Sequence, residues 1–364
     1  MSQNTIANVI QLRCQKIVSK HIDIENLGKD KNNKLFSIIE EYVQNVNPKL
    51  KNKILQNYFS FSIYNTDPYL ISHTEGKKFV TLIKDDLLEN MPHVIELNPG
   101  FGLLTECLLQ AGVPFLNLYE RNNDFYSDLY NLYKKYPKRF NLRKANLFKI
   151  SKMLNLHSTS TFHTNICELL SNIPERKWEE NTCMQVIGTT TKTLFLRHLI
   201  MSVLFQSGFM LYGRPTFYLA ISPYVWNKFA QLGNRINTTH IMFDILFDYK
   251  ILGTLDRNAF IPWEKRKLRN KSISQNYDID VLFVTKLEPK PNLYTIFGGK
   301  NNLIHFWHFV RHHFYKPSQR VIPALEKIIP GCGIKLISKL YTVTTVNIDT
   351  FRLVNLSKIF VSIV

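Results

Sequence analysis

The sequence predicts an α/β protein with a Rossmann-like, doubly wound parallel sheet and a smaller helical domain at its carboxyl end. From residue 93 onward, short apolar runs alternate with helical patterns in βαβαβ order. The first run leads into a turn that contains two glycines, and the second run ends on an acid, Glu120. A chain of 364 residues with 45% hydrophobic content can bury such a main domain and one further unit.

The predicted elements follow one another regularly through the main domain. A helix is expected over 69–88, a strand over 93–97, a turn over 98–102 and a helix that ends near Ala111, before Gly112. The further predicted strands span 115–120, 141–145, 184–187, 216–221 and 280–287, and further predicted helices span 193–206 and 224–232.

These patterns divide the chain into four predicted parts. The main domain spans 67–288, and short amphipathic helices follow over 289–364. A charged, helical extension is expected over 23–66. Residues 1–22 contain three cations and no acid, with apolar residues that can share one helical face, which is typical of a mitochondrial transit peptide. A surface helix of the mature protein explains this segment equally well.

The formal net charge is +18, and aromatic residues make up 13% of the chain. Phosphates attract cations and unpaired bases stack on aromatic rings, so this composition favours a single-stranded nucleic acid as partner. A basic protein with its aromatic residues in the core is the alternative. The candidate nucleic-acid contacts lie in the basic stretch 257–271, expected to be a loop, and in a predicted helix further on: Lys265, Arg266, Lys267, Arg269 and Arg311.

Other patterns narrow the class of protein. The five cysteines include no CxxC pair, so we expect free thiols in a reducing compartment. The longest apolar stretch, 194–212, is interrupted by polar residues, so we expect it to be buried and predict no membrane contact. His305 and His308 have metal-ligand spacing, but no carboxylate or thiol is close in sequence, and we predict an amphipathic helix there and no metal.

The strongest motif is VIELNPGFGLLT at residues 94–105. Glu96 ends a strand at the edge where open α/β sheets bind ligands, and the helix that follows directs its amino end at the same place. The glycines let the backbone approach a ligand, and Glu120 can accept hydrogen bonds from two ribose hydroxyls. The motif therefore predicts a nucleotide-type pocket; a tight turn without a ligand is the alternative. The predicted cofactor-binding residues are Glu96, Asn98, Gly100, Gly102, Leu103, Glu120 and Asn146.

E-L-N-P-G-F-G-L-L-T, followed by L-L-Q-A-G and L-Y-E-R, resembles the rRNA adenine dimethyltransferases and their mitochondrial relatives, the transcription factor B proteins. The Asn98-Pro99-Gly100 triplet is more similar to the second paralogue of the latter group. The resemblance implies a class I S-adenosylmethionine (SAM)-dependent methyltransferase (Rossmann-like) fold, a SAM site and a mitochondrial location in the matrix nucleoid. It spans roughly residues 65–355 and continues through 146–149, 223–229, 258–262 and 292–314.

The chain departs from the enzymes of this family at their catalytic motif. They carry Asn-Leu-Pro-Tyr or Asn-Ile-Pro-Phe after strand four, and the resemblance implies that this motif binds the amine of a flipped adenine and stacks on its ring. This sequence has Thr189, Thr190, Thr191 and Lys192 in that place. We interpret the tetrad as degraded and SAM as a vestigial ligand. A shifted alignment is the alternative, although Asn181 lies on the other side of the strand and does not restore the motif.

A second departure is Asn146, because the enzymes usually carry Asp there, in contact with the adenine amine of the cofactor. Asparagine can still bond an adenine edge, so cofactor binding is weakened but not excluded.

The resemblance to the second paralogue implies a monomeric initiation factor that assists a single-subunit mitochondrial RNA polymerase in melting promoter DNA. Two alternatives remain open. The first is an active, SAM-dependent mitochondrial rRNA adenine N6,N6-dimethyltransferase, whose partner is rRNA. The second is a nucleic-acid-binding module without a polymerase partner.

Overall fold

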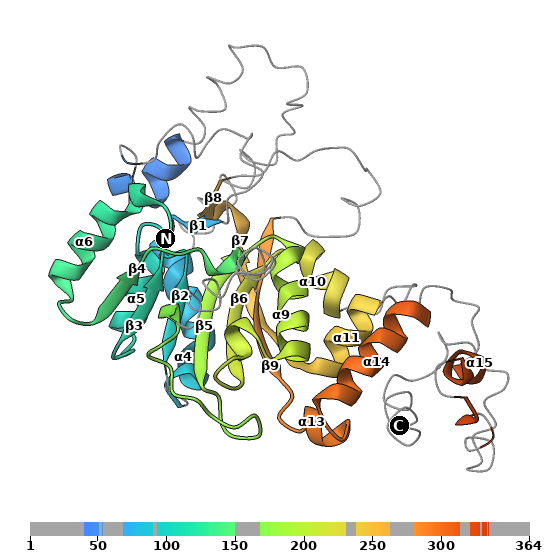
Figure 1. Cartoon of the computed structure of the whole chain (residues 1–364). Coiled ribbons are helices and arrows are strands. Elements are labelled where there is room, and N and C mark those ends of the chain that lie inside the picture. Colours follow the sequence, from blue (N-terminus) through green and yellow to red (C-terminus); the bar gives the residue numbers. More distant parts are fainter. Residues whose placement is uncertain are drawn as a thin grey trace, which may run out of the picture.

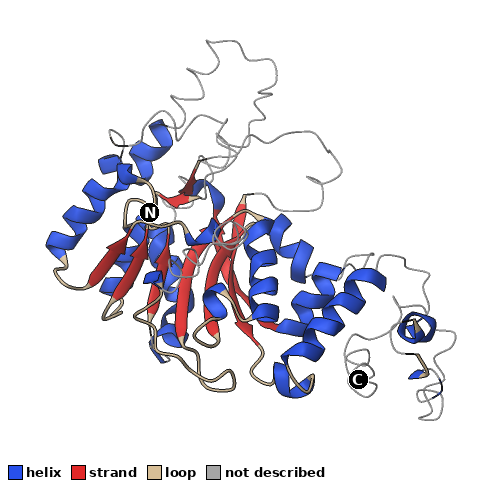
Figure 2. Ribbon diagram, viewed as in Figure 1, coloured by secondary structure: helices blue, strands red, loops and turns tan. Residues whose placement is uncertain are grey.

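A computed structural model describes residues 40–50, 53, 68–89, 93–149, 168–230, 238–262, 280–313, 321–327, 330–332 and 334. They form a seven-stranded sheet with helices on both faces (Figures 1 and 2). The strand order is β4-β3-β2-β5-β6-β9-β7. The strands are β2 (Val94–Leu97), β3 (Leu116–Tyr119), β4 (Phe140–Arg143), β5 (Met184–Thr190), β6 (Pro215–Ile221), β7 (Phe247–Asp256) and β9 (Val281–Pro289).

The order of the strands places a ligand-binding edge at the centre of the sheet. From β2 the chain moves outward through β3 to β4, and then returns to the other side of β2 with β5 and β6. These five strands are parallel. Helices that follow β2 and β5 therefore diverge at the carboxyl ends of two adjacent strands, which is the position where open α/β sheets bind their ligands.

The prediction of a wholly parallel sheet is wrong for its last strands. β9 runs antiparallel to both β6 and β7, and β7 was not predicted at all. β7 lies at the edge, and most of its ten residues are exposed or half-buried, so it lacks the apolar run that indicates an interior strand. Its identity as a strand depends on hydrogen bonds to β9, which the local pattern does not contain.

The predicted helix over 69–88 begins later than expected. Tyr69–Leu70 form a short strand, β1, which pairs antiparallel with β8 (Phe260–Ile261), and α4 runs over His73–Glu89. The basic stretch expected to be a loop thus starts as a 3-10 turn, Arg257–Ala259, and β8. Pairing between segments so far apart in the chain has no local signal.

Two hydrophobic cores cover the two faces of the sheet. Strand residues alternate between them, because successive side chains of a strand point to opposite faces: Val94 joins one core and Ile95 the other. The first core is covered by α4, α5 (Leu103–Gln110) and α6 (Tyr126–Lys135). The second core is covered by α9 (Thr193–Phe205), α10 (Pro223–Ala230), α11 (Thr238–Leu246), α13 (Leu293–Ile296) and α14 (Lys300–His313).

The helices after β9 share the core of the sheet. Leu293, Phe297, Leu303, Phe306 and Val310 are buried in the same cluster as the side chains of β5 and β6. Within the described residues, this part of the predicted segment 289–364 is helical as expected and packs on the layer formed by α9 and α11 (Figure 1). The short α15 (Val321–Glu326) adds Leu325 to the same cluster.

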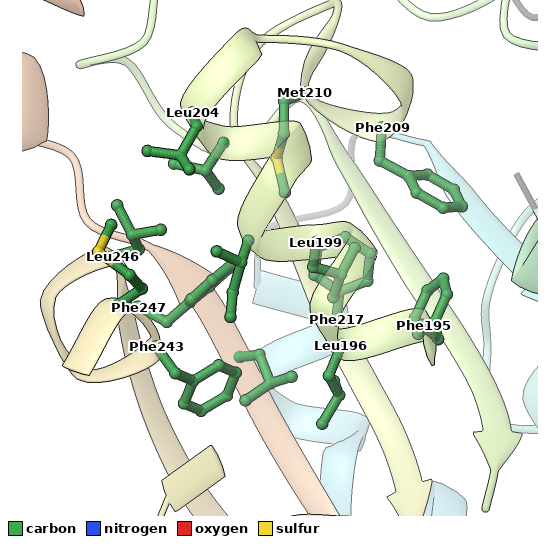
Figure 3. Close-up of a cluster of buried hydrophobic side chains, with 14 of the residues drawn as sticks. Phe195, Leu196, Leu199, Leu204, Phe209, Met210, Phe217, Phe243, Leu246 and Phe247 are labelled. Carbon is green, nitrogen blue, oxygen red and sulfur yellow. The ribbon is translucent and has the colours of Figure 1, made fainter. Parts of the chain in front are cut away.

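The apolar stretch after β5 is a core element. Among the described residues, one helical stretch, Thr193–Met210, is long and apolar enough to cross a membrane, and 61% of it is buried inside the fold. Its phenylalanines pack edge-to-face, with the ring centroids of Phe195 and Phe209 6.0 Å apart and those of Phe209 and Phe217 5.6 Å apart (Figure 3). Burial among these rings accounts for its apolar composition, as predicted.

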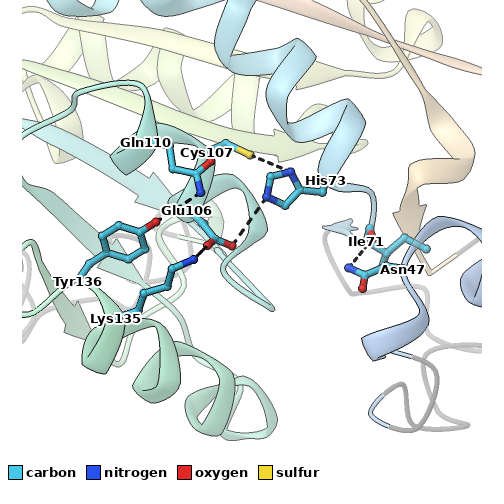
Figure 4. A network of polar contacts seen from close by, with 8 residues as sticks. All are labelled: Asn47, Ile71, His73, Glu106, Cys107, Gln110, Lys135 and Tyr136. Carbon is cyan, nitrogen blue, oxygen red and sulfur yellow. Dashed lines mark hydrogen bonds and ion pairs between the residues drawn. The ribbon is translucent and has the colours of Figure 1, made fainter.

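Polar contacts join the helices of the first core at the surface. Lys135 of α6 forms an ion pair with Glu106 of α5, and Gln110 donates a hydrogen bond to the hydroxyl of Tyr136 at 3.4 Å (Figure 4). Asn47 donates to the carbonyl of Ile71 at 3.4 Å, so the described part of the extension 23–66 lies against the start of the main domain. The predicted transit segment 1–22 lies outside the described residues.

The second core predicts a large effect for one truncation. Phe243 of α11 is fully buried, and its ring lies 5.1 Å from those of Phe247 and Tyr249 and 5.5 Å from that of Phe229. We expect Phe243→Ala to lower the free energy of unfolding by about 3–5 kcal/mol, because it removes these contacts and leaves a cavity. Urea denaturation followed by circular dichroism measures the change.

Phe115→Ala is the matched control, since Phe115 is 44% exposed before β3. We expect it to change the free energy of unfolding by less than about 1 kcal/mol. Equal losses for the two variants would contradict the assignment of Phe243 to a packed core.

Candidate functional site

The turn after β2 is built from left-handed backbone. Asn98, Gly100 and Gly102 have φ values of 52°, 56° and 75°, and α5 begins at Leu103. Asparagine tolerates this region better than other side chains, and its backbone N–H donates to the carbonyl of Tyr119 at 2.9 Å. The N-P-G-F-G sequence therefore folds as predicted, with a tight turn between the sheet and a helix amino terminus.

An aromatic ring lies against this turn on one side. A Cβ atom on Gly100 would come within 2.7 Å of the Tyr69 ring, so the glycine is required for this close approach. Tyr69 packs on Phe125, whose ring centroid is 4.5 Å away, and Phe101 contacts Phe125 at 4.8 Å. Gly100 thus accommodates Tyr69, beside the predicted approach of a ligand. Tyr69 was not among the predicted site residues, because it reaches the turn through its pairing with β8.

Glu96 carries a buried carboxyl group and is the residue before the last one of β2, close to the turn. It is 1% exposed, and the hydroxyl of Thr105 in α5 donates to its Oε2 at 2.7 Å. Burial raises the pKa of Glu96 to about 8; the hydrogen bond from Thr105 opposes this shift, and the charge of Glu120 adds to it. Near neutral pH this carboxyl therefore holds a proton, and a positive charge beside it would release that proton.

Glu120 follows β3 and holds the turn from the neighbouring strand. It is 1% exposed, and it accepts hydrogen bonds from the backbone N–H of Gly100 at 3.1 Å and of Asn122 at 2.8 Å. A buried carboxylate at the end of the second strand is the kind of acceptor that the hydroxyls of a ribose require.

Asn146 lies beyond β4, close to the same edge of the sheet. Its Oδ1 atom is buried and has no hydrogen-bond partner in the described structure. A buried acceptor without a donor costs about 1–3 kcal/mol, so the position favours a ligand that brings an N–H group. The exocyclic amine of an adenine is such a donor. Asn146 and Glu120 therefore fit the adenosine half of SAM.

The tetrad that replaces the catalytic motif begins inside the sheet. Thr189 and Thr190 are buried residues of β5, and they pair with Ala220 and Ile221 of β6. The backbone N–H of Lys192 donates to Oγ1 of Thr190 at 3.3 Å, which turns the chain toward α9. No amide, proline or aromatic side chain stands in this segment.

An aromatic side chain from the 3-10 turn after β4 lies close to Gly188 of β5. A Cβ on Gly188 would lie 2.8 Å from Cζ of Phe148, and Phe148 packs edge-to-face on Phe195 at 4.8 Å. Phe148 is buried at the carboxyl ends of β2 and β5, where Gly188 pairs with Leu97. Its position depends on tertiary packing, and only its proximity to Asn146 in the sequence could have indicated it.

Of the predicted nucleic-acid residues, Arg311 lies in the described part of the chain. Lys265, Arg266, Lys267 and Arg269 lie outside the described residues. Arg311 is exposed on α14, with its guanidinium carbon 5.4 Å from the ring centroid of Trp307, and α14 lies beyond α9 and α11 from the turn (Figure 1). His305 and His308 are exposed on the same helix, and within the described part of the chain no three His, Cys, Asp or Glu side chains gather as a metal site would require.

Three features define a class I SAM-dependent methyltransferase fold: the strand order of the sheet, the antiparallel β9, and a glycine-containing turn after β2 that is bonded to the acid after β3. Two homologous proteins are similar to this chain in sequence. The chain is 28% identical over 254 residues to dimethyladenosine transferase 2, mitochondrial, of Drosophila melanogaster, and 24% identical over 272 residues to the protein of the same name in Rattus norvegicus. These matches cover 67% and 70% of this chain, and 56% and 68% of the two relatives.

The homologues confirm the resemblance to the dimethyltransferase family and to its second paralogue, and their names agree with the predicted mitochondrial location. No protein-family model matches the chain. Among solved structures, the 23S rRNA methyltransferase ErmE has a TM-score of 0.48 at 12% identity and covers 81% of this chain and 99% of its own. A dimethyladenosine transferase from Plasmodium falciparum has a TM-score of 0.41 at 11% identity, with coverage of 75% and 82%.

The buried carboxyl group makes stability depend on pH in a defined direction. Between pH 4.5 and about 8 the unfolded chain has released the proton of Glu96 and the native protein keeps it, so this group lowers the free energy of unfolding as the pH rises. Glu96→Gln removes the effect. We expect the free energy of unfolding of Glu96→Gln, minus that of the wild type, to increase by up to about 1.4 kcal/mol per pH unit between pH 5.5 and 7.5.

Urea denaturation of both proteins at several pH values measures this difference, and other titrating groups cancel in it. Glu168→Gln, at an exposed residue, is the control and should show a constant difference. A wild-type protein that gains stability over the variant with rising pH would contradict the assignment of a protonated Glu96.

Proposed function

We propose that this protein is a mitochondrial transcription initiation factor that helps a single-subunit RNA polymerase to melt promoter DNA, on a methyltransferase scaffold that no longer transfers methyl groups. The tetrad carries this proposal. Its first two residues are buried threonines of β5, and the amide and aromatic groups that bind a flipped adenine in the resembling enzymes are absent from residues 188–192. A location in the matrix nucleoid is part of the proposal.

The chemistry of adenine methylation explains why the tetrad matters. The exocyclic amine is a weak nucleophile, because its lone pair is delocalised into the ring. A site that methylates it has to accept hydrogen bonds from the amine and stack on the base. Thr189 can accept one bond through a short side chain, and Lys192 places a cation where a stacking ring is needed. These residues bring no group that would activate the amine.

A basic scaffold for a flipped base can still bind a displaced strand. The chain carries a net charge of +18, which supports binding to a polyanion. Melting DNA costs about 1.4 kcal/mol per base step, whereas stacking of one base on an aromatic side chain returns roughly 1–3 kcal/mol. A few captured bases therefore offset the cost of a few opened pairs, without any chemical step.

We propose in addition that the adenosine pocket is retained. Glu120 would accept from the ribose hydroxyls, Asn146 would accept from the adenine amine, and buried Glu96 would lie beside the cationic part of the ligand. When bound, SAM supplies a methyl group on a positively charged sulfur, and the degraded tetrad leaves that group without an acceptor.

Calorimetric titration with S-adenosylhomocysteine tests the pocket. We expect Glu120→Ala to weaken binding by about 10–100-fold, because it removes a charged acceptor, and Asn146→Ala by about 5–10-fold. Gln110→Ala, at an exposed position of α5, should bind as the wild type does. A wild-type protein that does not bind, or a Glu120→Ala variant that binds equally well, would refute the retained pocket.

Run-off transcription with the cognate mitochondrial polymerase tests the main proposal. On linear duplex promoter DNA we expect specific transcripts only when this protein is added, since the polymerase alone pays the full cost of melting. On a template already mismatched around the start site, the requirement should largely disappear. Equal initiation on duplex promoter with and without the protein would overturn the proposal and favour a nucleic-acid-binding module without a polymerase partner.

The enzymatic alternative makes a separate prediction. An active dimethyltransferase would transfer labelled methyl groups from SAM to a small-subunit rRNA hairpin, and Glu96→Ala would abolish the transfer. We expect no transfer above that of the Glu96→Ala variant. Transfer that depends on Glu96 would contradict the non-catalytic part of the proposal and leave the role in initiation to be judged by run-off transcription.

A further inference from the structure

Two segments leave the sheet side by side at its carboxyl edge. Thr190 of β5 pairs with Ile221 of β6, and these are the last paired residues of the two strands. The chain continues from the first as the end of the tetrad and α9, and from the second as α10. The first turns of α9 and α10 therefore flank the position where the resembling enzymes hold their target base.

The exposed side chains of these turns are aromatic, apolar and basic. Tyr224, in the first turn of α10, is 40% exposed, and Nζ of Lys228 lies 4.1 Å from its ring centroid. Leu194, in the first turn of α9, is 45% exposed, and Arg197 is exposed one turn further on.

The helix that carries Tyr224 is packed into the core by its buried residues. Val225, Trp226 and Phe229 are buried, with the Trp226 ring 5.6 Å from that of Tyr249. The carbonyl of Phe229 bonds to Nδ1 of His240 in α11 at 2.9 Å. A ring on such a helix loses little conformational entropy when it stacks on a ligand, which favours binding.

The acidic and basic residues of this region are all of one kind, namely basic. Residues 181–243, which include β5, the tetrad, α9, β6 and α10, contain five Lys or Arg residues and no Asp or Glu, although 28 of the 364 residues in the chain are acidic. The missing acids lower the cost of bringing phosphates to this edge. An exposed ring beside cations is the arrangement by which proteins bind single-stranded nucleic acid without reading its sequence.

We propose that Tyr224 and Lys228 form a binding site for one unpaired nucleotide of single-stranded DNA, next to the degraded tetrad. The base stacks on the Tyr224 ring, Leu194 contacts its edge, and the ammonium of Lys228 neutralises the adjoining phosphate. This inference rests on the proposed function for its choice of DNA. It replaces capture of a base inside the tetrad with capture on α10.

The chain offers a matched control of the same chemistry. Tyr130 on α6 is 60% exposed, and Nζ of Lys134 lies 4.6 Å from its ring centroid. α6 precedes β4, an edge strand that is separated from β6 by β3, β2 and β5 (Figure 1). Tyr130→Ala therefore removes an equivalent tyrosine–lysine pair far from the tetrad.

Fluorescence anisotropy with a labelled single-stranded DNA oligonucleotide tests the proposal on the whole protein. We expect Tyr224→Ala to weaken binding by about 5–50-fold, because a stacking partner is lost. Tyr224→Phe should stay within about twofold of the wild type, since it keeps the ring. Lys228→Ala should reduce the slope of log Kd against log salt by about 1. Tyr130→Ala should bind as the wild type does.

Three outcomes would overturn the inference: Tyr224→Ala binds single-stranded DNA as well as the wild type does, Tyr130→Ala is equally impaired, or the Tyr224→Ala defect is confined to RNA or duplex DNA. Circular dichroism of each variant checks that the fold is kept, and Tyr224→Phe reports on stacking even where Tyr224→Ala is unstable. Run-off transcription remains a separate readout. If run-off transcription requires the wild-type protein but Tyr224→Ala binds single-stranded DNA without impairment, this site is refuted and the proposed function stands.

Discussion

The hydrogen bond between Glu120 and the backbone of Gly100 is the interaction on which the candidate site depends. Glu96 and Glu120 are both buried at the carboxyl ends of adjacent strands, where an unsatisfied carboxylate would be costly. Glu120 accepts hydrogen bonds from the backbone N–H groups of Gly100 and Asn122, and Glu96 is protonated and bonded to Thr105. The left-handed turn therefore joins two strands and a helix.

The rest of the fold supports this edge from two sides. Alternate strand residues supply one core under α4, α5 and α6 and a second core under α9, α10, α11 and α14. Helices on both faces hold the strands at a constant register, so the ends of β2, β3, β5 and β6 remain next to one another. Glu96 and Glu120 lie at the first two ends, and the tetrad and α10 follow the last two.

The strand ends differ in the chemistry of their side chains. Glu120 and Asn146 present acceptors of the kind that an adenosine ligand requires, whereas the end of β5 carries threonines and brings neither an amide nor an aromatic ring. The same edge carries exposed aromatic and basic side chains without nearby acids in sequence, and the proposed binding of nucleic acid rests on these side chains.

The sequence by itself determined the local parts of this protein. It predicted the five parallel strands, the turn after β2 and the loss of the catalytic motif, because left-handed turns, buried runs and missing functional groups are properties of consecutive residues. The tertiary structure decided the rest. Four contacts join residues far apart in the chain: the pairing of Tyr69 with β8, that of β9 with β7, the place of Phe148 beside Gly188, and the pairing of Thr190 with Ile221. Such contacts form through burial and hydrogen bonds between distant segments, which a local pattern does not encode.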